Sequence, residues 1–241
     1  MDPIIFAHRG ANRLAPENTK AAFSLAYELG AQAIEFDVQL TSDEVPVVIH
    51  DATLHRTTNG QGLIVQHTLS ELQQLSAGSW FDIQFSQEKI LSLSQALDYL
   101  VPLGLYINIE IKANANSNIV PAVLKVLQQA NAGSDQILIS SFDPQIIEQF
   151  SALKKFSYAL LVDELNFDLI EFAARKKCFS IHPSHHLLAG IAGFDFINHA
   201  HQSGLKVFVF TINDLIEAQE LLTKKIDGYF TDNPLLYHFS S

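Results

Sequence analysis

Cysteine is nearly missing from this chain of 241 residues, in which Cys178 is the only one. A lone cysteine excludes an internal disulfide, so the folded chain depends on its hydrophobic core. Stable disulfides are rare in reducing compartments, and the lack of one here favours a cytoplasmic location.

Basic residues are also scarce, since 15 lysines and arginines stand against 26 acidic residues and give a formal net charge of −11. This negative balance argues against binding nucleic acid through a basic surface, and we expect no nucleic-acid partner. An anionic substrate must then be held by a local group of positive charges. The composition gives no indication of an oligomeric state.

Long apolar runs are missing too. No uncharged run approaches the length of a membrane span, so we expect no stable membrane association. The chain passes from Met1-Asp2-Pro3 directly into the apolar run 4–7, without the basic region and cleavage site of a secretory signal. We therefore expect no such signal.

What the sequence does contain is a regular alternation of short β-rich apolar runs with longer segments of helical periodicity. Eight strands interleaved with helices predict a closed (β/α)8 barrel, or TIM barrel, and 241 residues fit one such domain over 1–241. An open doubly wound sheet is the alternative. The predicted strands are Pro3–His8, Ala33–Val38, Leu105–Lys112, Gln136–Ser141, Ser157–Val162, Phe179–His182, Lys206–Ile212 and Asp227–Thr231. The predicted helices are Asn18–Leu29, Ser92–Leu100, Asn118–Gln129, Pro144–Leu153, Phe167–Ala174, Phe194–Ser203 and Leu215–Leu222.

The connection between His50 and Leu105 is too long for an ordinary barrel loop. Long connections in compact domains are usually functional. We interpret roughly 51–90 as a small insertion after the second strand, over one end of the barrel.

The run Ala33–Val38 carries two carboxylates on an otherwise apolar strand, and the run from Pro46 doubles back beside it. Strand alternation places Glu35 and Asp37 on the same face. Like charges about 4 Å apart repel by roughly 4 kcal/mol at an effective dielectric of about 20, so the pair needs a cation, a base or a shared proton. A cation is our working hypothesis.

A third carboxylate comes from the run Leu105–Lys112, in which Glu110 and Lys112 share the polar face. If the aliphatic face packs on helices, Glu110 lies near Glu35 and Asp37; an edge strand with a wet face is the alternative. Three carboxylates form a hard-oxygen site that favours one divalent cation, Mg²⁺ or Ca²⁺, over zinc. We expect Lys112 to pair partly with Glu110 and also to face an anion.

Two histidines flank this predicted metal site. His8 and Arg9 end the first strand before Gly10, which would let the chain turn sharply past a ligand, and His50 follows the strand that runs back from Pro46. One strand-end histidine is more often structural, but two beside carboxylates suit general acid and base catalysis near neutral pH.

Four motifs, in the right order, resemble those of the glycerophosphodiester phosphodiesterase family of the bacterial cytoplasmic type. They are HRGANRLAPENTKAAF at 8–23, EFDVQLTSDEVPVVIHDATLHRTTNGQG at 35–62, NIEIK at 108–112 and DGYFTDNP at 227–234. The resemblance covers the chain from end to end. It implies a TIM barrel with an insertion after the second strand, and a divalent metal that supports hydrolysis of glycerophosphodiesters to an alcohol and glycerol 3-phosphate.

The resemblance also implies roles for individual residues. His8 and His50 become the catalytic pair, and the metal ligands are Glu35, Asp37 and Glu110. Arg9 and Lys112 become phosphate contacts. The family commonly has a tryptophan late in the seventh strand, where this chain offers Phe210 as a substrate contact, and a usual proline is replaced in 89–93.

Weaker candidates surround this set. Asn18 stands where a helix N-cap is expected, and its place in the motif suggests that it also braces the site. His182, Ser141 and Phe142 lie at strand ends and are candidates for lining the pocket.

The sequence therefore predicts a metal-dependent phosphodiesterase whose partner is a small-molecule phosphodiester such as glycerophosphocholine or glycerophosphoethanolamine. Two alternatives stay open. One is a lysophospholipase D, or a lyase-like enzyme that stops at a cyclic phosphate. The other is a binding module that has kept the fold and lost turnover. The residues do not decide which histidine is the acid, or whether water or the glycerol 2-hydroxyl attacks.

Overall fold

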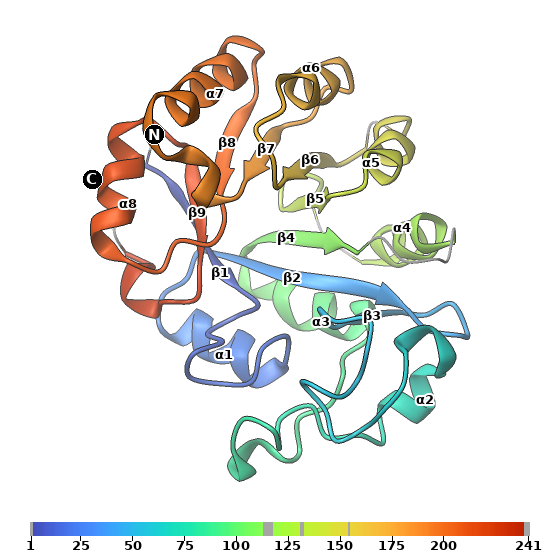
Figure 1. The fold of residues 1–241 in the computed structure, drawn as a ribbon. Helices are drawn as coiled ribbons and strands as arrows, with labels where there is room; N and C mark the ends of the chain where they lie inside the picture. The colour runs from blue at the N-terminus through green and yellow to red at the C-terminus, as the bar shows by residue number, and fades with distance from the viewer. Residues whose placement is uncertain (1, 113–117, 131–132, 154, 239–241) are drawn as a thin grey trace.

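The computed structural model describes residues 2–112, 118–130, 133–153 and 155–238. Within these residues, eight parallel strands follow one another in the order β1-β9-β8-β7-β6-β5-β4-β2, and β1 also pairs with β2 (Figure 1). This last pairing closes the sheet into a ring. The predicted (β/α)8 barrel is therefore confirmed, and the open doubly wound sheet is excluded.

The element bounds agree with the predicted ones within a few residues. The barrel strands are β1 Ile4–His8, β2 Ala33–Leu40, β4 Tyr106–Ile111, β5 Ile137–Ser141, β6 Ser157–Val162, β7 Ser180–Pro183, β8 Lys206–Val209 and β9 Gly228–Thr231. The helices are α1 Lys20–Glu28, α2 Leu69–Leu72, α3 Leu93–Leu100, α4 Ile119–Gln129, α5 Pro144–Ser151, α6 Phe167–Arg175, α7 Gly190–Gln202 and α8 Leu215–Thr223.

Each barrel strand buries both of its faces. On β2, Ile34, Phe36 and Val38 point outward into the core that the strands share with the helices. The inner faces meet in a second core inside the barrel, where Phe6 stacks on Phe230 with ring centroids 4.6 Å apart. Strand alternation thus directs the aliphatic side chains to the helices and leaves the other face for the barrel interior.

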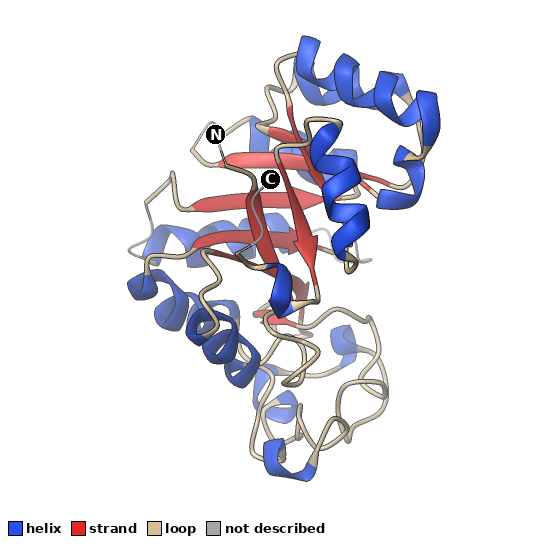
Figure 2. Cartoon of the chain, turned by 90° about the vertical axis from the view of Figure 1, so that its left-hand side faces the viewer, coloured by secondary structure: helices blue, strands red, loops and turns tan. Residues whose placement is uncertain are grey.

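The strand β3, Pro46–Val48, runs antiparallel to β2 outside the barrel ring, as the doubling back of the chain predicts. The stretch from β3 to α3 then passes through short helical turns and α2, and forms the loop-rich part at the lower right of Figure 2. It has a small hydrophobic core of its own, formed by Val47, Ile49, Leu54, Ile64, Leu72, Ala77 and Ile90. This core fixes the position of His50, which follows Ile49 directly.

Two local predictions are wrong. The helix expected at Phe194–Ser203 begins at Gly190. The sequence pattern did not predict this start, because Gly190 and Gly193 lie in the first turn and glycine disfavours helix interiors. Gly193 is there for packing, since a Cβ at this position would lie 2.4 Å from the Leu188 backbone.

The N-cap of α1 is the second wrong prediction. Thr19 and not Asn18 caps this helix, through its hydroxyl, which accepts a hydrogen bond from Ala22 N. Asn18 has a positive φ of 59° and turns its side chain toward β2 instead. The geometry of Asn18 therefore fits the expectation that it braces the site, and not the expectation that it caps the helix.

Candidate active site

The three predicted acidic residues meet at the carboxyl end of the barrel. Asp37 on β2 lies opposite Glu110 on β4 in the strand register, and Glu35 comes two residues before Asp37 on the same face. One oxygen from each carboxylate lies within 4.8 Å of the others, and all three residues are buried. Barrel active sites lie at this end, where loops and strand tips converge.

Positive charge compensates this cluster unevenly. Lys112 Nζ lies 2.9 Å from Asp37 and 2.5 Å from Glu110, and Arg9 Nε lies 3.3 Å from Asp37. Asn18 also donates a hydrogen bond of 2.9 Å to Asp37. Although burial opposes its charge, Lys112 and Arg9 hold the pKa of Asp37 well below its usual range.

Glu35 is in the opposite situation. Burial raises the pKa of Glu35 well above its usual value, and repulsion from Asp37 and Glu110 raises it further. Burial and Asp37 raise the pKa of Glu110 as well. Among the described residues, Glu35 Oε1 is buried without a hydrogen-bond partner. An unpartnered buried oxygen beside two further carboxylates fits a bound cation, so this cluster could hold a metal ion.

The first histidine is held by a carboxylate that the sequence analysis did not assign. His8 Nδ1 lies 2.6 Å from Oδ1 of Asp232, directly after β9, and Nε2 is turned to Glu35 at 3.9 Å. Burial opposes the charge of Asp232, but the His8 ring and the amides of Asn12 and Asn213 lower its pKa below the usual range. The signal was present, because Asp232 is a carboxylate at a barrel strand end, as Asp37 is.

The second histidine is held in the same way. His50 Nδ1 lies 2.6 Å from Oδ1 of Asp51, and Arg56 makes two hydrogen bonds to that carboxylate, of 2.7 and 2.8 Å. Arg56 also donates two hydrogen bonds to Glu17, which accepts another from Arg9. A continuous chain of ion pairs therefore connects His50 with Arg9.

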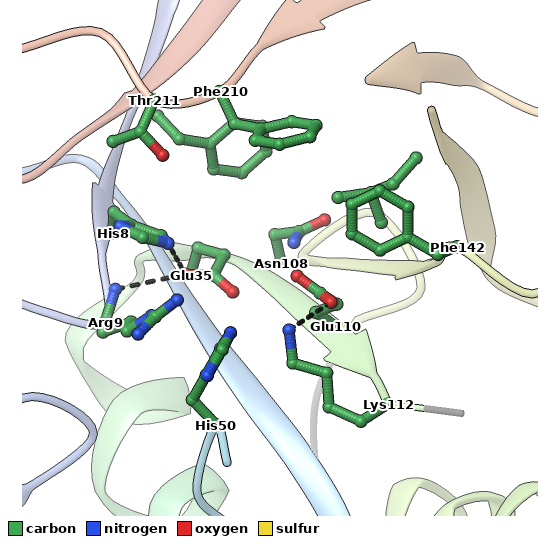
Figure 3. Close-up of a pocket in the computed structure, with 12 residues that line it drawn as sticks. His8, Arg9, Glu35, His50, Asn108, Glu110, Lys112, Phe142, Phe210 and Thr211 are labelled. Carbon is green, nitrogen blue, oxygen red and sulfur yellow. Dashed lines mark hydrogen bonds and ion pairs between the residues drawn. The ribbon is translucent and has the colours of Figure 1, made fainter. Parts of the chain in front are cut away.

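A cavity of about 200 Å³, which we call the inner cavity, lies between the two histidines and the charged residues of the site. Figure 3 shows His8 and Arg9 on one side of it and Glu110 and Lys112 on the other, with Phe210 above and His50 below. Of the predicted site residues, Asp37 does not line it. Phe142 lines it too, and its ring meets that of Phe210 edge-on at a centroid distance of 5.7 Å.

Two smaller expectations about this site need correction. His182 is fully buried against Phe208 and Phe230 and is not among the residues that line the inner cavity. Ser141 is buried as well, and its hydroxyl donates a hydrogen bond to the carbonyl of Ile111. The sharp turn expected at Gly10 is present, with φ of 82°, and a Cβ there would lie 2.7 Å from the backbone of Ala22 on α1.

Fold and site together define a class of protein. It is the class of (β/α)8-barrel enzymes whose acidic and histidine side chains line a cavity at the carboxyl end of the strands. None of the helices in the described part of the chain is long and apolar enough to cross a membrane.

Comparison with known proteins then identifies the family. Residues 8–236 match the model of the glycerophosphoryl diester phosphodiesterase family. A glycerophosphodiester phosphodiesterase of Caldanaerobacter subterraneus subsp. tengcongensis is 33% identical over 240 residues, which cover 97% of this chain and 96% of that relative. The chain belongs to the glycerophosphodiester phosphodiesterase family, and its enzyme class is that of the family. The resemblance found in the motifs is confirmed.

Solved structures agree with this assignment. A phosphodiesterase of Oleispira antarctica, in complex with the product sn-glycerol-3-phosphate, superposes with a TM-score of 0.89 at 32% identity and covers 97% of this chain and 94% of that one. A glycerophosphodiester phosphodiesterase of Agrobacterium tumefaciens has a TM-score of 0.81 at 29% identity, with 98% of each chain covered.

Proposed function

We propose that this protein hydrolyses soluble glycerophosphodiesters, such as glycerophosphocholine or glycerophosphoethanolamine, to an alcohol and sn-glycerol 3-phosphate. The observation that carries the proposal is the convergence of two carboxylate-backed histidines, His8 and His50, on a cavity that Glu35 and Glu110 of the acidic cluster also line. The product complex of the Oleispira antarctica enzyme supports the proposed product.

Glu35, Asp37 and Glu110 would hold one divalent cation. A site made only of carboxylate oxygens favours Mg²⁺ or Ca²⁺ over metals that prefer nitrogen or sulfur ligands. The raised pKa values of Glu35 and Glu110 support this role, because burial and repulsion between the carboxylates raise them and a bound cation would offset both effects. Once bound, such a cation supplies Lewis-acid stabilisation of the negative charge on the phosphoryl oxygens.

His8 and His50 would act as general base and general acid. Each ring has its Nδ1 against a carboxylate, Asp232 or Asp51, so each Nδ1 carries a proton and Nε2 is left to exchange one with the substrate. One ring would take a proton from the attacking oxygen, and the other would give one to the departing alcohol.

Arg9 and Lys112 would hold the phosphate. Negative charge grows on the phosphate oxygens as the attacking oxygen approaches, so these cations would stabilise the transition state more than the ground state. Their buried acidic neighbours keep both of them charged, since Asp37 raises the pKa of each against the effect of burial. Phe210 would contact the carbon atoms of the substrate at the cavity wall.

The proposal is tested by assaying the purified protein on glycerophosphocholine and lysophosphatidylcholine, after chelation and after the return of Mg²⁺ or Ca²⁺. We expect glycerol 3-phosphate from glycerophosphocholine only with a metal present, and a loss of about a thousandfold or more in Glu35→Gln. Glu28→Gln, which changes an exposed glutamate on α1, is the matched control and should keep full activity. Full activity in chelator, or in Glu35→Gln, would contradict the proposal.

We further propose a cytoplasmic enzyme built as one barrel domain over 1–241, in which residues 51–90 are inserted. The separate hydrophobic core of this stretch supports the insertion, and the single buried thiol of Cys178 suits a reducing compartment. Fractionation of cells that express the chain at native level should recover it with cytoplasmic markers, and recovery outside the cell would contradict the location.

A further inference from the structure

A second hollow continues from the inner cavity. It has a volume of about 470 Å³, and we call it the outer groove. Four residues line both spaces, namely His50, Glu110, Lys112 and Phe142. From these the outer groove extends over Gln39, Asp51, Ala52, Thr53 and Ile111, between the end of β4 and the stretch that follows β3.

The inner cavity is small and bounded by the barrel interior. Leu161, Phe210 and Phe230 give it an apolar wall. Its polar lining residues include Asn108, which is buried and donates a hydrogen bond to Ser140. In the described part of the chain, Asn108 Oδ1 has no hydrogen-bond partner. A buried acceptor without a partner is costly unless a bound group donates to it, and a ligand hydroxyl would do so.

The outer groove differs in size and in lining. It has more than twice the volume of the inner cavity, and an amide, a carboxylate and a hydroxyl line it, from Gln39, Asp51 and Thr53. Gln39 is fixed by its hydrogen bond of 2.7 Å to the carbonyl of His50. These groups can exchange hydrogen bonds with a polar molecule that stays partly in water.

A phosphodiester needs two such spaces, because its phosphorus carries two ester groups that point in different directions. The four shared residues include a proposed catalytic histidine, a proposed metal ligand and a proposed phosphate contact, so the phosphate belongs between the two spaces. Glycerol is the constant half of the proposed substrates and suits a small chamber in which Asn108 Oδ1 is a fixed acceptor. The alcohol is the variable half and suits a larger, open and polar groove.

We propose that the outer groove is the binding site for the alcohol half of the substrate, a polar alcohol, and that its lining sets which alcohols are accepted. The inference rests on the proposed function. It makes the groove wall, and Ala52 in particular, a determinant of specificity. Ala52 is exposed at the groove, and its backbone carbonyl accepts a hydrogen bond from Ile64 N that a side-chain substitution leaves in place.

The test enlarges residue 52 and compares alcohols of different size. Wild type, Ala52→Leu and Ala52→Trp are assayed on the glycerophosphodiesters of methanol, choline and inositol. We expect kcat/KM for the inositol and choline diesters, relative to the methanol diester, to fall about tenfold or more in Ala52→Trp and by less in Ala52→Leu. The inhibition constant of glycerol 3-phosphate should change by less than about threefold, because the glycerol half lies in the inner cavity.

Ala152→Trp is the matched control, since Ala152 is an exposed alanine at the C-terminal end of α5 and lines neither the inner cavity nor the outer groove. It should leave both the ratio and the activity unchanged. An unchanged ratio in Ala52→Leu and Ala52→Trp would overturn the inference. So would an equal loss on all three diesters together with weaker inhibition by glycerol 3-phosphate, which would place glycerol in the groove. If wild type turned over none of the diesters with any divalent cation, the proposed function itself would fall.

Discussion

Acidification should destabilise this protein through one buried histidine, His182. Its imidazole is fully buried, has Ser180 as its hydrogen-bond partner and packs on Phe208 and Phe230. Burial lowers the pKa of His182 from 6.5 to about 3. Between these two values the unfolded chain binds a proton that the folded chain does not, so unfolding becomes more favourable as the pH falls.

The size of the effect follows from this difference in pKa. Between about pH 7.5 and about pH 5.5, His182 should remove roughly 1.4 kcal/mol from the free energy of unfolding. Each further pH unit down to about 3 should remove a similar amount. Below the folded pKa the folded chain is protonated too, and the loss levels off.

Urea denaturation at the two pH values measures this contribution when wild type is compared with His182→Gln. The variant is expected to be less stable at both values, but its loss on acidification should be smaller by about 1.4 kcal/mol. His55→Gln, at an exposed histidine between β3 and α3, is the control and should lose as much as wild type. If His182→Gln also lost as much as wild type, the reasoning that a neutral imidazole is enforced by burial would be refuted.

Three further predictions concern the site. Asp232→Asn removes the carboxylate that holds the His8 ring and should lower kcat/KM by about 10²- to 10⁴-fold. Steady-state kinetics measures this loss, and circular dichroism checks that the variant is folded. A loss below about threefold would mean that Asp232 does not orient the ring. Arg56→Met breaks the chain of ion pairs between His50 and Arg9 and should lower kcat/KM about ten- to a hundredfold. Added guanidinium should restore part of the activity. Unaltered kinetics would mean that this chain of ion pairs does not position His50 and Arg9. Asn108→Leu removes the unpartnered acceptor of the inner cavity and should raise the inhibition constant of glycerol 3-phosphate about tenfold in a competition assay. An unchanged inhibition constant would mean that Asn108 does not contact the glycerol.

The barrel was predictable because short β-rich apolar runs take turns along the chain with segments of helical periodicity. Within β2 and β4, polar and apolar side chains also alternate. On β2 and β4 this alternation also predicted the acidic cluster, since the side that carries Glu35 and Asp37 can only be the barrel interior if Ile34 and Phe36 pack on helices. A period of two is the most reliable pattern that a strand offers. The barrel fold and the acidic cluster were therefore predicted from the same strand residues.

What escaped prediction depends on contacts between distant segments. The pairing of His8 with Asp232 joins residues 224 apart in the chain, and it exists only because closure of the barrel puts β9 beside β1. Asn18 is comparable, because its turn toward Asp37 needs a positive φ that no local pattern announces. The outer groove was not visible either, since its walls come from β4 and from the stretch after β3, whose relative position follows from packing alone.

The central claim is that one divalent cation binds between Glu35, Asp37 and Glu110, and anomalous diffraction from crystals grown with Mn²⁺ tests it most directly. We expect one strong anomalous peak at about 2.0–2.6 Å from carboxylate oxygens of this cluster, and its loss in crystals of Glu35→Gln. A peak bound elsewhere, or a peak in the cluster that persists unchanged in Glu35→Gln, would contradict the account.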